Sequence, residues 1–242
     1  MSSDAPILIL KTGETLPPVK ERFGDFEAWI AQGLGRAAEE VSVAAAYEGD
    51  PLPAPESLAG VVVTGSPAMV TDRAGWSEAS AQWLRRVIEG DLIPAFGLCY
   101  GHQLMAHALG GEVGPNPNGR EMGTVSVSFL EGKVAGDQLL EAGVFPGHMS
   151  HVESVLVAPT DAKRLATTAI EANAALQFGP RQWGVQFHPE FDRSIMQCYV
   201  EARREILAAE GHDPDGMIEG AVETPELNRV LEKFARVFVD GG

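Results

Sequence analysis

The amino-acid sequence predicts an α/β fold, with a mostly parallel central sheet flanked by helices and an added region of antiparallel or mixed strands. Strand-like and helix-like segments alternate over the first 111 residues. These strand-like segments are apolar throughout, as expected for a parallel sheet covered on both faces. After residue 111, strand-like segments follow one another with little helix between them. The chain has 242 residues, 45% of them hydrophobic, and shows no internal repeat, so we expect one domain over residues 1–242.

In the first half, short apolar segments that end at turn residues predict buried strands. The expected strands cover residues 7–10, 41–47, 59–63 and 92–98. Helical spacing of apolar side chains predicts helices over residues 25–34, 77–89 and 101–109. The second of these helices is expected to begin at Ser77 as its N-cap and to stop at Gly90. Prolines at alternate positions of residues 50–55 predict a loop there.

The second half is expected to contain more strand than helix, which indicates antiparallel or mixed pairing. The expected strands cover residues 124–130, 152–157, 164–168, 174–178 and 182–187. One short helix is expected among them, over residues 136–141. Two longer helices are expected over residues 193–209 and 225–239, separated by a polar loop at residues 211–216.

The charge and the hydrophobic pattern exclude several functional classes. The net charge is −16, and an acidic surface repels the phosphate backbone of nucleic acids. No apolar segment approaches the ~18 residues that a membrane span needs, and residues 1–6 do not resemble a signal peptide. Two cysteines are too few for a disulfide framework. We therefore expect a cytoplasmic protein that binds neither nucleic acid nor membrane.

The segment over residues 96–103 reads Phe-Gly-Leu-Cys-Tyr-Gly-His-Gln and is the most informative part of the sequence. An apolar strand enters Gly-x-Cys-x-Gly and a helix begins at once, which is the nucleophile-elbow pattern with Cys99 in place of serine. Such a turn exposes the sulfur at the end of the strand, and the helix N-terminus favours the thiolate. The alternative is a small buried cysteine at a tight turn, but the two glycines and the strand-to-helix change favour a nucleophile.

A second segment, residues 184–191, supplies the residues that a thiolate nucleophile needs. It reads Gly-Val-Gln-Phe-His-Pro-Glu-Phe, so a strand ends directly at His188. Sites in parallel α/β folds gather at the carboxyl ends of strands, which makes His188 the predicted general base. Glu190 follows two residues later and is expected to orient the imidazole and to stabilise its charged form.

An acyl-transfer site also needs hydrogen-bond donors that face the developing oxyanion. The backbone N–H of Tyr100, directly after the nucleophile, is the first expected donor. The second is expected from the turn at residues 64–67, where Gly65 follows an apolar strand and allows a ligand to approach the backbone. The alternative is an ordinary turn before a helix.

Together these segments resemble the class I (triad-type) glutamine amidotransferases, in particular stand-alone members that are similar to GMP synthase. The resemblance rests on residues 97–103, on residues 184–191 and on the turn at Gly65, and it covers most of the chain. The Met-Ser-His segment at residues 149–151 resembles a segment in the amidotransferase part of GMP synthase. The resemblance implies a flavodoxin-like class I amidotransferase architecture.

The resemblance also implies the chemistry. The Cys99 thiolate would attack the side-chain amide of glutamine, release ammonia and leave a γ-glutamyl thioester that water hydrolyses. Gln103 matches a position that lines the glutamine pocket, and Gly123 lies where the family has a turn near the substrate. No cofactor is expected.

Three hypotheses remain for the substrate and the partner of this protein. The sequence contains neither a P-loop nor a dinucleotide-binding fingerprint, so an ATP-dependent acceptor of ammonia would be a separate synthase subunit. A γ-glutamyl peptidase or hydrolase would use the same triad on a γ-glutamyl compound. The third hypothesis is a non-catalytic binding or regulatory protein, against which the complete set of Cys99, His188 and Glu190 argues.

His148 and His151 have a spacing of three residues, with Glu153 close by, and this raises the question of a metal site. No further His or Cys pair at ligand spacing supports one, so we expect no metal. His151 is expected near the active site, where it would contact the substrate, or on a partner surface.

Overall fold

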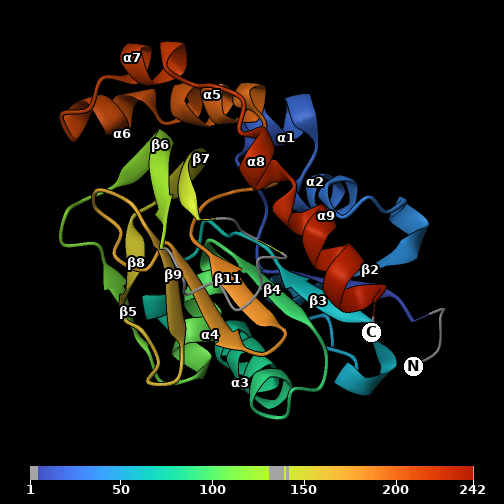
Figure 1. Cartoon of the computed structure of the whole chain (residues 1–242). Coiled ribbons are helices and arrows are strands. Elements are labelled where there is room, and N and C mark those ends of the chain that lie inside the picture. Colours follow the sequence, from blue (N-terminus) through green and yellow to red (C-terminus); the bar gives the residue numbers. More distant parts are fainter. Residues whose placement is uncertain (1–4, 131–138, 140–141, 242) are drawn as a thin grey trace.

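The computed structural model describes residues 5–130, 139 and 142–241 of the chain. Its centre is a nine-stranded sheet with the strand order β2-β1-β3-β4-β11-β10-β9-β6-β7, and β5 and β8 form a separate two-stranded sheet (Figure 1). The strands are β1 (Ile7–Lys11), β2 (Val41–Ala45), β3 (Gly60–Val63), β4 (Ala95–Leu98), β5 (Glu112–Pro115), β6 (Glu121–Phe129), β7 (Gly143–His151), β8 (Glu153–Val157), β9 (Lys163–Thr167), β10 (Ala175–Gly179) and β11 (Gln182–Val185).

Five neighbouring strands, from β2 to β11, are parallel, and the remaining pairs of the large sheet are antiparallel. The predicted α/β class, with a parallel sheet and added antiparallel strands, is therefore confirmed. The antiparallel strands do not form a layer of their own, because β11 is parallel to β4 and antiparallel to β10 and so joins both parts into one sheet.

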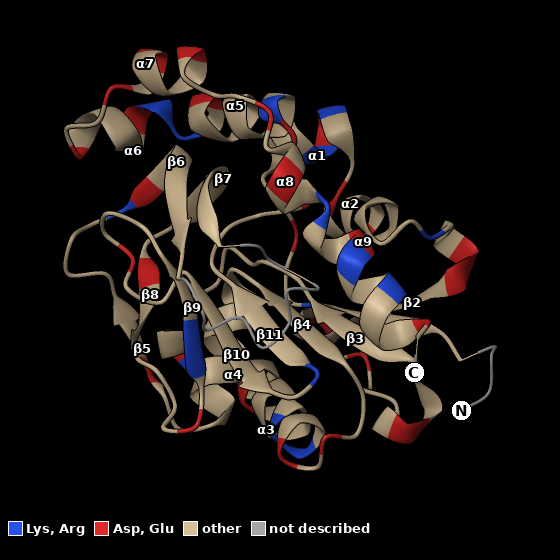
Figure 2. Ribbon diagram, viewed as in Figure 1, with Lys and Arg blue, Asp and Glu red and all other residues tan. Residues whose placement is uncertain are grey.

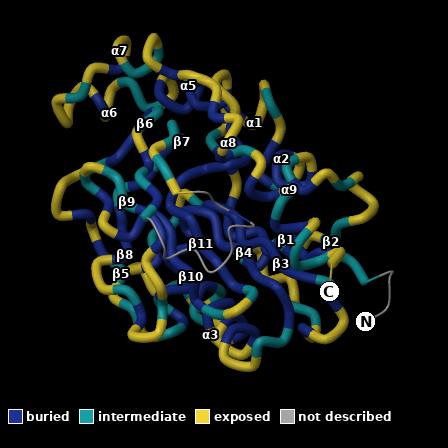
Figure 3. The backbone as a smooth tube through the Cα atoms, viewed as in Figure 1, coloured by how far each residue is buried: buried dark blue, intermediate teal, exposed yellow. Residues whose placement is uncertain are grey.

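The helices are α1 (Pro17–Phe23), α2 (Phe26–Gly33), α3 (Gly75–Glu89), α4 (Tyr100–Ala108), α5 (Arg193–Ala202), α6 (Arg204–Ala209), α7 (Pro214–Glu219), α8 (Pro225–Asn228) and α9 (Val230–Phe234). Alternation along β1 sends Ile7 and Ile9 to one face of the sheet and Leu8 and Leu10 to the other. The first face packs against α2, α5 and α9, and the second packs against α3 and α4. The central strands are consequently buried on both faces (Figure 3).

Charged side chains lie mainly on the helices and connecting segments at the periphery, and the strands of the large sheet carry few of them (Figure 2). None of the helices in the described part of the chain combines the length and the apolar character that crossing a membrane requires.

The carboxyl ends of β3, β4 and β11 lie at the same edge of the sheet, because these strands are parallel. Above the neighbouring strands β6 and β7, the helices α5, α6 and α7 form a group at the top of Figure 1.

Several predicted boundaries were wrong. Ser77 is not an N-cap, since α3 begins at Gly75, and the Ser77 hydroxyl instead shares a hydrogen bond of 2.6 Å with the Tyr100 hydroxyl. The expected helix over 193–209 is interrupted at Arg203, whose φ of −111° and ψ of 12° separate α5 from α6. The expected helix over 225–239 is also divided, into α8, α9 and a π-helical turn at Ala235–Val239.

Two α-helices and two strands of the described residues were missed by the sequence analysis: α1, α7, β5 and β7. The expected loop at 211–216 contains the start of α7, which Asp213 caps by accepting from the Gly216 N–H at 3.1 Å, with Pro214 in the first turn. β7 contains Pro146 and two glycines, yet it pairs with β6 along nine residues at the edge of the sheet, where proline is tolerated. The short helix expected over 136–141 falls largely on residues outside the described part, so it stays a prediction.

Candidate active site

Cys99 lies at the turn between β4 and α4, in a backbone conformation that few residues adopt. Its φ is 48° and its ψ is −99°, and its N–H donates to the Val185 carbonyl at 2.8 Å. Glycines on both sides make the sharp turn sterically feasible. A Cβ atom on Gly97 would lie 2.6 Å from the Gly101 carbonyl carbon, and one on Gly101 would lie 2.5 Å from the Val63 carbonyl oxygen. The strained conformation is thus held by close packing between β3, β4 and α4.

His188 follows β11 and lies against Cys99, because β11 and β4 are parallel neighbours. Nδ1 of His188 is 2.7 Å from Oε1 of Glu190, and both side chains are buried. The imidazole stacks on the Phe191 ring at a centroid distance of 4.1 Å and an interplanar angle of 14°. Stacking and the carboxylate together fix the ring, and the buried Nε2 makes no hydrogen bond within the described residues.

The charge state of His188 follows from these neighbours. Burial opposes a charge on the imidazole, but Glu190 and Cys99 outweigh it and raise the pKa of His188 to about 10. Two other buried histidines behave in the opposite way. Burial lowers the pKa of His102 to about 3 and, together with the charge of His188, lowers that of His148 to about 4. His188 is therefore the histidine that this site keeps protonated at neutral pH.

This charge state predicts a pH dependence of stability. The pKa of His188 in the folded protein lies above the ordinary value of ~6.5. The charged imidazole therefore contributes fully to the free energy of unfolding below pH 6.5, and this contribution is lost as the pH rises towards 10. Glu190→Gln removes the carboxylate charge, so we expect the variant to lose less of its free energy of unfolding between pH 6.5 and 10 than the wild type does.

Urea unfolding at intervals of one pH unit measures this difference, and the ring protons of His188 in an NMR titration give its pKa directly. Groups that titrate elsewhere in the chain act equally in both proteins and cancel in the comparison. Parallel stability curves for the two proteins, with an unchanged His188 titration, would contradict the assignment of Glu190 as the residue that holds the charge.

Gln186 is a buried residue next to the sulfur that the sequence analysis did not single out. Nε2 of Gln103 donates to the Glu153 carbonyl at 2.7 Å and to Oε1 of Gln186 at 3.0 Å. Since Oε1 of Gln186 is the acceptor, its amide NH₂ faces Cys99, at 3.4 Å from the sulfur. A donor in this position favours a negatively charged sulfur. The signal was present in the sequence as a polar residue inside an apolar strand, two positions before His188.

The turn at residues 64–67 is held in place by Thr12, the residue directly after β1. The Thr12 N–H donates to Oγ1 of Thr64 at 3.0 Å, and the Ser66 hydroxyl donates to the Thr12 carbonyl at 2.7 Å. A Cβ atom on Gly65 would lie 3.1 Å from Cε1 of His188, so a glycine there lets the turn approach the imidazole. Within the described residues, neither the Gly65 N–H nor the Tyr100 N–H donates to a protein acceptor. Both predicted oxyanion donors are thus free.

A cleft opens at Cys99 and has two lobes, each containing Cys99, Ser66, Pro67, Ser150 and Arg203. The first lobe extends to His188 and the aromatic side chains, and the second extends along Tyr100, Gln103 and His151. The volumes of these open lobes are about 290 and 370 Å³. Cys99 therefore lines a partly enclosed cleft.

The remaining predicted site residues take different positions. His151 lines the second lobe, and its Nε2 lies 3.1 Å from Oε2 of Glu121. Gly123 is not among the residues that line the cleft; it lies in β6 opposite Met149, with a φ of 98°. His148 and His151 are three residues apart on a strand and point to opposite sides. Among the described residues, no group of three or more His, Cys, Asp or Glu side chains is arranged to hold a metal ion.

Comparison with known proteins shows similarity to glutamine amidotransferases and to GMP synthases. The family model described as glutamine amidotransferase class-I matches residues 21–203. The glutamine-hydrolyzing GMP synthase of Aeropyrum pernix is 38% identical over 189 residues, which are 76% of this chain and 34% of that protein. That of Bacteroides fragilis is 34% identical over an aligned length of 258, gaps included, which covers 90% of this chain and 48% of that protein. The chain thus spans between a third and a half of the length of these two relatives.

A solved structure supports the fold independently of close sequence similarity. The crystal structure of a glutamine amidotransferase from Thermotoga maritima superposes with a TM-score of 0.74 at 19% identity, over 96% of this chain and 97% of the other. At this identity the likeness concerns the fold, including the arrangement of parallel and antiparallel strands.

Proposed function

Because the chain belongs to the class I glutamine amidotransferase family, we propose that it hydrolyses the side-chain amide of glutamine at Cys99, with His188 and Glu190 completing the triad. The observation that carries the proposal is the buried contact of 2.7 Å between His188 and Glu190, beside a cysteine held in a strained turn. Each side chain has the neighbour that nucleophilic amide hydrolysis requires.

The charge state of His188 defines the order of proton transfers in this proposal. With a pKa of about 10, His188 is an imidazolium at neutral pH, and the nucleophile in this proposal is the thiolate form of Cys99. The thiolate attacks the amide carbon, and the N–H groups of Tyr100 and Gly65 stabilise the oxyanion. His188 then donates its proton to the leaving nitrogen, so ammonia departs and a γ-glutamyl thioester remains.

The second half of the reaction returns the enzyme to its resting state. Neutral His188 removes a proton from water, and the resulting hydroxide attacks the thioester carbon. Glutamate leaves and the sulfur becomes a thiolate again, beside the reprotonated imidazole. Gln186, whose amide donates towards the sulfur, stabilises the thiolate at the start and at the end of this cycle.

We further propose that the ammonia is used by a separate synthase subunit. The two relatives described above are named as GMP synthases, and the chain covers 34% and 48% of their length. The class-I glutamine amidotransferase model matches residues 21–203 of this chain, so we infer that the aligned part of those proteins is their amidotransferase portion. A synthase with an ATP-dependent acceptor site would therefore complete the reaction.

The test is chemical labelling with 6-diazo-5-oxo-norleucine, an electrophile that resembles glutamine. We expect this reagent to modify Cys99 stoichiometrically, as measured by intact mass and peptide mapping, and glutamine to slow the modification. Cys99→Ser should lose the labelling, and Cys198→Ser is the matched control that should retain it, since Cys198 lies in α5 and is buried.

Glutamine hydrolysis is followed in parallel. Labelling together with release of ammonia would support an enzyme that acts alone, and labelling without turnover would support dependence on a synthase subunit. Equal modification of Cys99 and Cys198, or no protection by glutamine, would overturn the proposed nucleophile and substrate.

A further inference from the structure

Arg203 is a cation inside the cleft that the triad does not explain. It ends α5, and its side chain lies over the Tyr199 ring with Cζ 5.3 Å from the ring centroid. It lines both lobes of the cleft, together with Cys99. Nη1 is buried and has no hydrogen-bond partner within the described residues. Burial also lowers the pKa of Arg203, so its surroundings do not offset the cost of placing a charge there.

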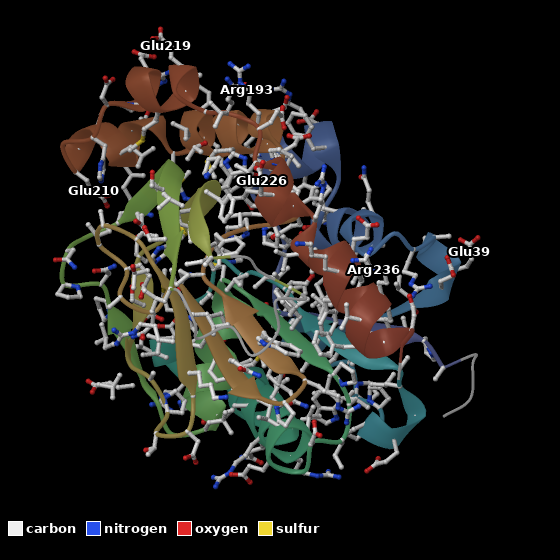
Figure 4. All side chains as sticks on the ribbon, viewed as in Figure 1. Glu39, Arg193, Glu210, Glu219, Glu226 and Arg236 are labelled. Carbon is white, nitrogen blue, oxygen red and sulfur yellow. The ribbon has the colours of Figure 1, made fainter. Side chains whose placement is uncertain are left out.

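The acidic side chains of the same cleft are already engaged with other groups. Glu153 accepts from the Val70 N–H at 2.9 Å, and Glu14 forms an ion pair with Lys20. Arg120, the other arginine of the cleft, forms two hydrogen bonds of 2.7 and 3.0 Å with Glu210, the residue labelled beside α6 in Figure 4. Among the described residues Arg203 takes part in no ion pair.

A partly buried guanidinium that has no counter-ion and one buried N–H group without a partner is unfavourable unless a ligand supplies the charge. The cleft therefore requires an anion at this position when substrate is bound. A guanidinium recognises a carboxylate by two parallel N–H···O bonds, and the substrate class of this enzyme carries carboxylates. Stacking on Tyr199 holds the guanidinium plane, which reduces the entropy that binding would cost.

We propose that Arg203 is the specificity-determining residue that binds a carboxylate of the substrate while Cys99 attacks its γ-amide; this inference rests on the proposed function. The carboxylate has two sources. One is the α-carboxylate of the glutamyl group, which glutamine and every γ-glutamyl compound possess. The other is a carboxylate on the leaving group, which a γ-glutamyl peptide possesses and glutamine does not.

The experiment measures binding through protection of Cys99 from iodoacetamide, so it does not depend on turnover. Four ligands are titrated: glutamine, glutamine α-amide, γ-glutamylglycine and γ-glutamylglycinamide. The concentration that halves the alkylation rate is determined for the wild type, for Arg203→Met and for Arg203→Lys. Arg193→Met is the matched control, because Arg193 is exposed at the start of the same helix (Figure 4).

In Arg203→Met we expect the half-protecting concentration of carboxylate-bearing ligands to rise by about tenfold or more, since a charge-assisted hydrogen-bond pair is lost. Arg203→Lys should keep part of the protection that Arg203→Met loses, and Arg193→Met should be protected as the wild type is. A rise for glutamine but not for its α-amide would assign the α-carboxylate. A rise for γ-glutamylglycine alone would assign the leaving-group carboxylate.

Two results distinguish failure of this inference from failure of the proposed function. Unchanged protection by all four ligands in Arg203→Met, with an unchanged alkylation rate of the free enzyme, would overturn the role of Arg203 and leave the triad untouched. Protection by none of the ligands in the wild type would overturn the inference too. In that case, labelling of Cys99 by 6-diazo-5-oxo-norleucine decides separately whether glutamine is the substrate.

Discussion

Replacing His188 by alanine is expected to lower kcat/KM for glutamine hydrolysis by about 10⁴-fold or more. In the proposed mechanism the imidazolium both stabilises the thiolate and protonates the departing nitrogen, so one substitution removes two steps. Because members of a triad act as a unit, the double variant Cys99→Ala, His188→Ala should be no slower than Cys99→Ala alone. Formation of glutamate is the primary measurement, and the rate of Cys99 alkylation by 6-diazo-5-oxo-norleucine is the second.

His107→Ala is the matched control, because His107 lies at the far end of α4 and pairs with the surface residue Glu78 at 3.0 Å. It should retain full activity. An activity of His188→Ala within about tenfold of the wild type, in a protein of unchanged stability, would exclude His188 from the chemistry. Additive losses in the double variant would instead indicate that the two residues act independently.

Gly101→Ala is expected to destabilise the fold by about 1–3 kcal/mol or more, the range found when extra atoms are forced into a packed core. The added Cβ would lie 2.5 Å from the Val63 carbonyl oxygen and 2.8 Å from the Val63 Cβ. The Gly101 N–H also donates to the Thr64 carbonyl at 3.2 Å. β3 and α4 cannot move apart without breaking the turn that holds Cys99. Activity should therefore fall together with stability.

The free energy of unfolding is measured in urea, and Gly75→Ala is the control. Gly75 begins α3, and a Cβ atom there would meet nothing within 4 Å. Alanine is the better helix former, so this control should be neutral or slightly stabilising. If Gly101→Ala were as stable as the control and fully active, the close approach of β3 and α4 would not be needed to form the nucleophile turn.

The sequence determined the parts of this protein that depend on neighbouring residues. Glycines on both sides of Cys99 specify a turn that other residues cannot form, and the apolar segments before them specify buried strands. The strand end at His188, followed by proline and Glu190, specifies a histidine with a carboxylate close by. The parallel fold then follows, because strands of this kind need helices on both faces.

Other elements depended on partners far away in the chain. β7 contains residues that disfavour strands, and it forms because nine residues of β6 supply its hydrogen bonds. The continuous helical spacing over 193–209 concealed the break at Arg203, since apolar periodicity reports which face is buried and not where the backbone turns. Local composition also concealed α7, whose capping residue lies in a segment that is otherwise typical of a loop.

The chemistry of the site divides in the same way. The sequence by itself determined the nucleophile turn and the pairing of His188 with Glu190, because each is built from residues within a few positions of one another. Only the tertiary structure decided that the Gln186 amide faces the sulfur, that Gly123 does not line the cleft, and that Arg203 lines it without a partner for Nη1 among the described residues. These features arise where separate strands and helices pack together. Whether a polar group there has a hydrogen-bond partner depends on side chains from distant parts of the chain.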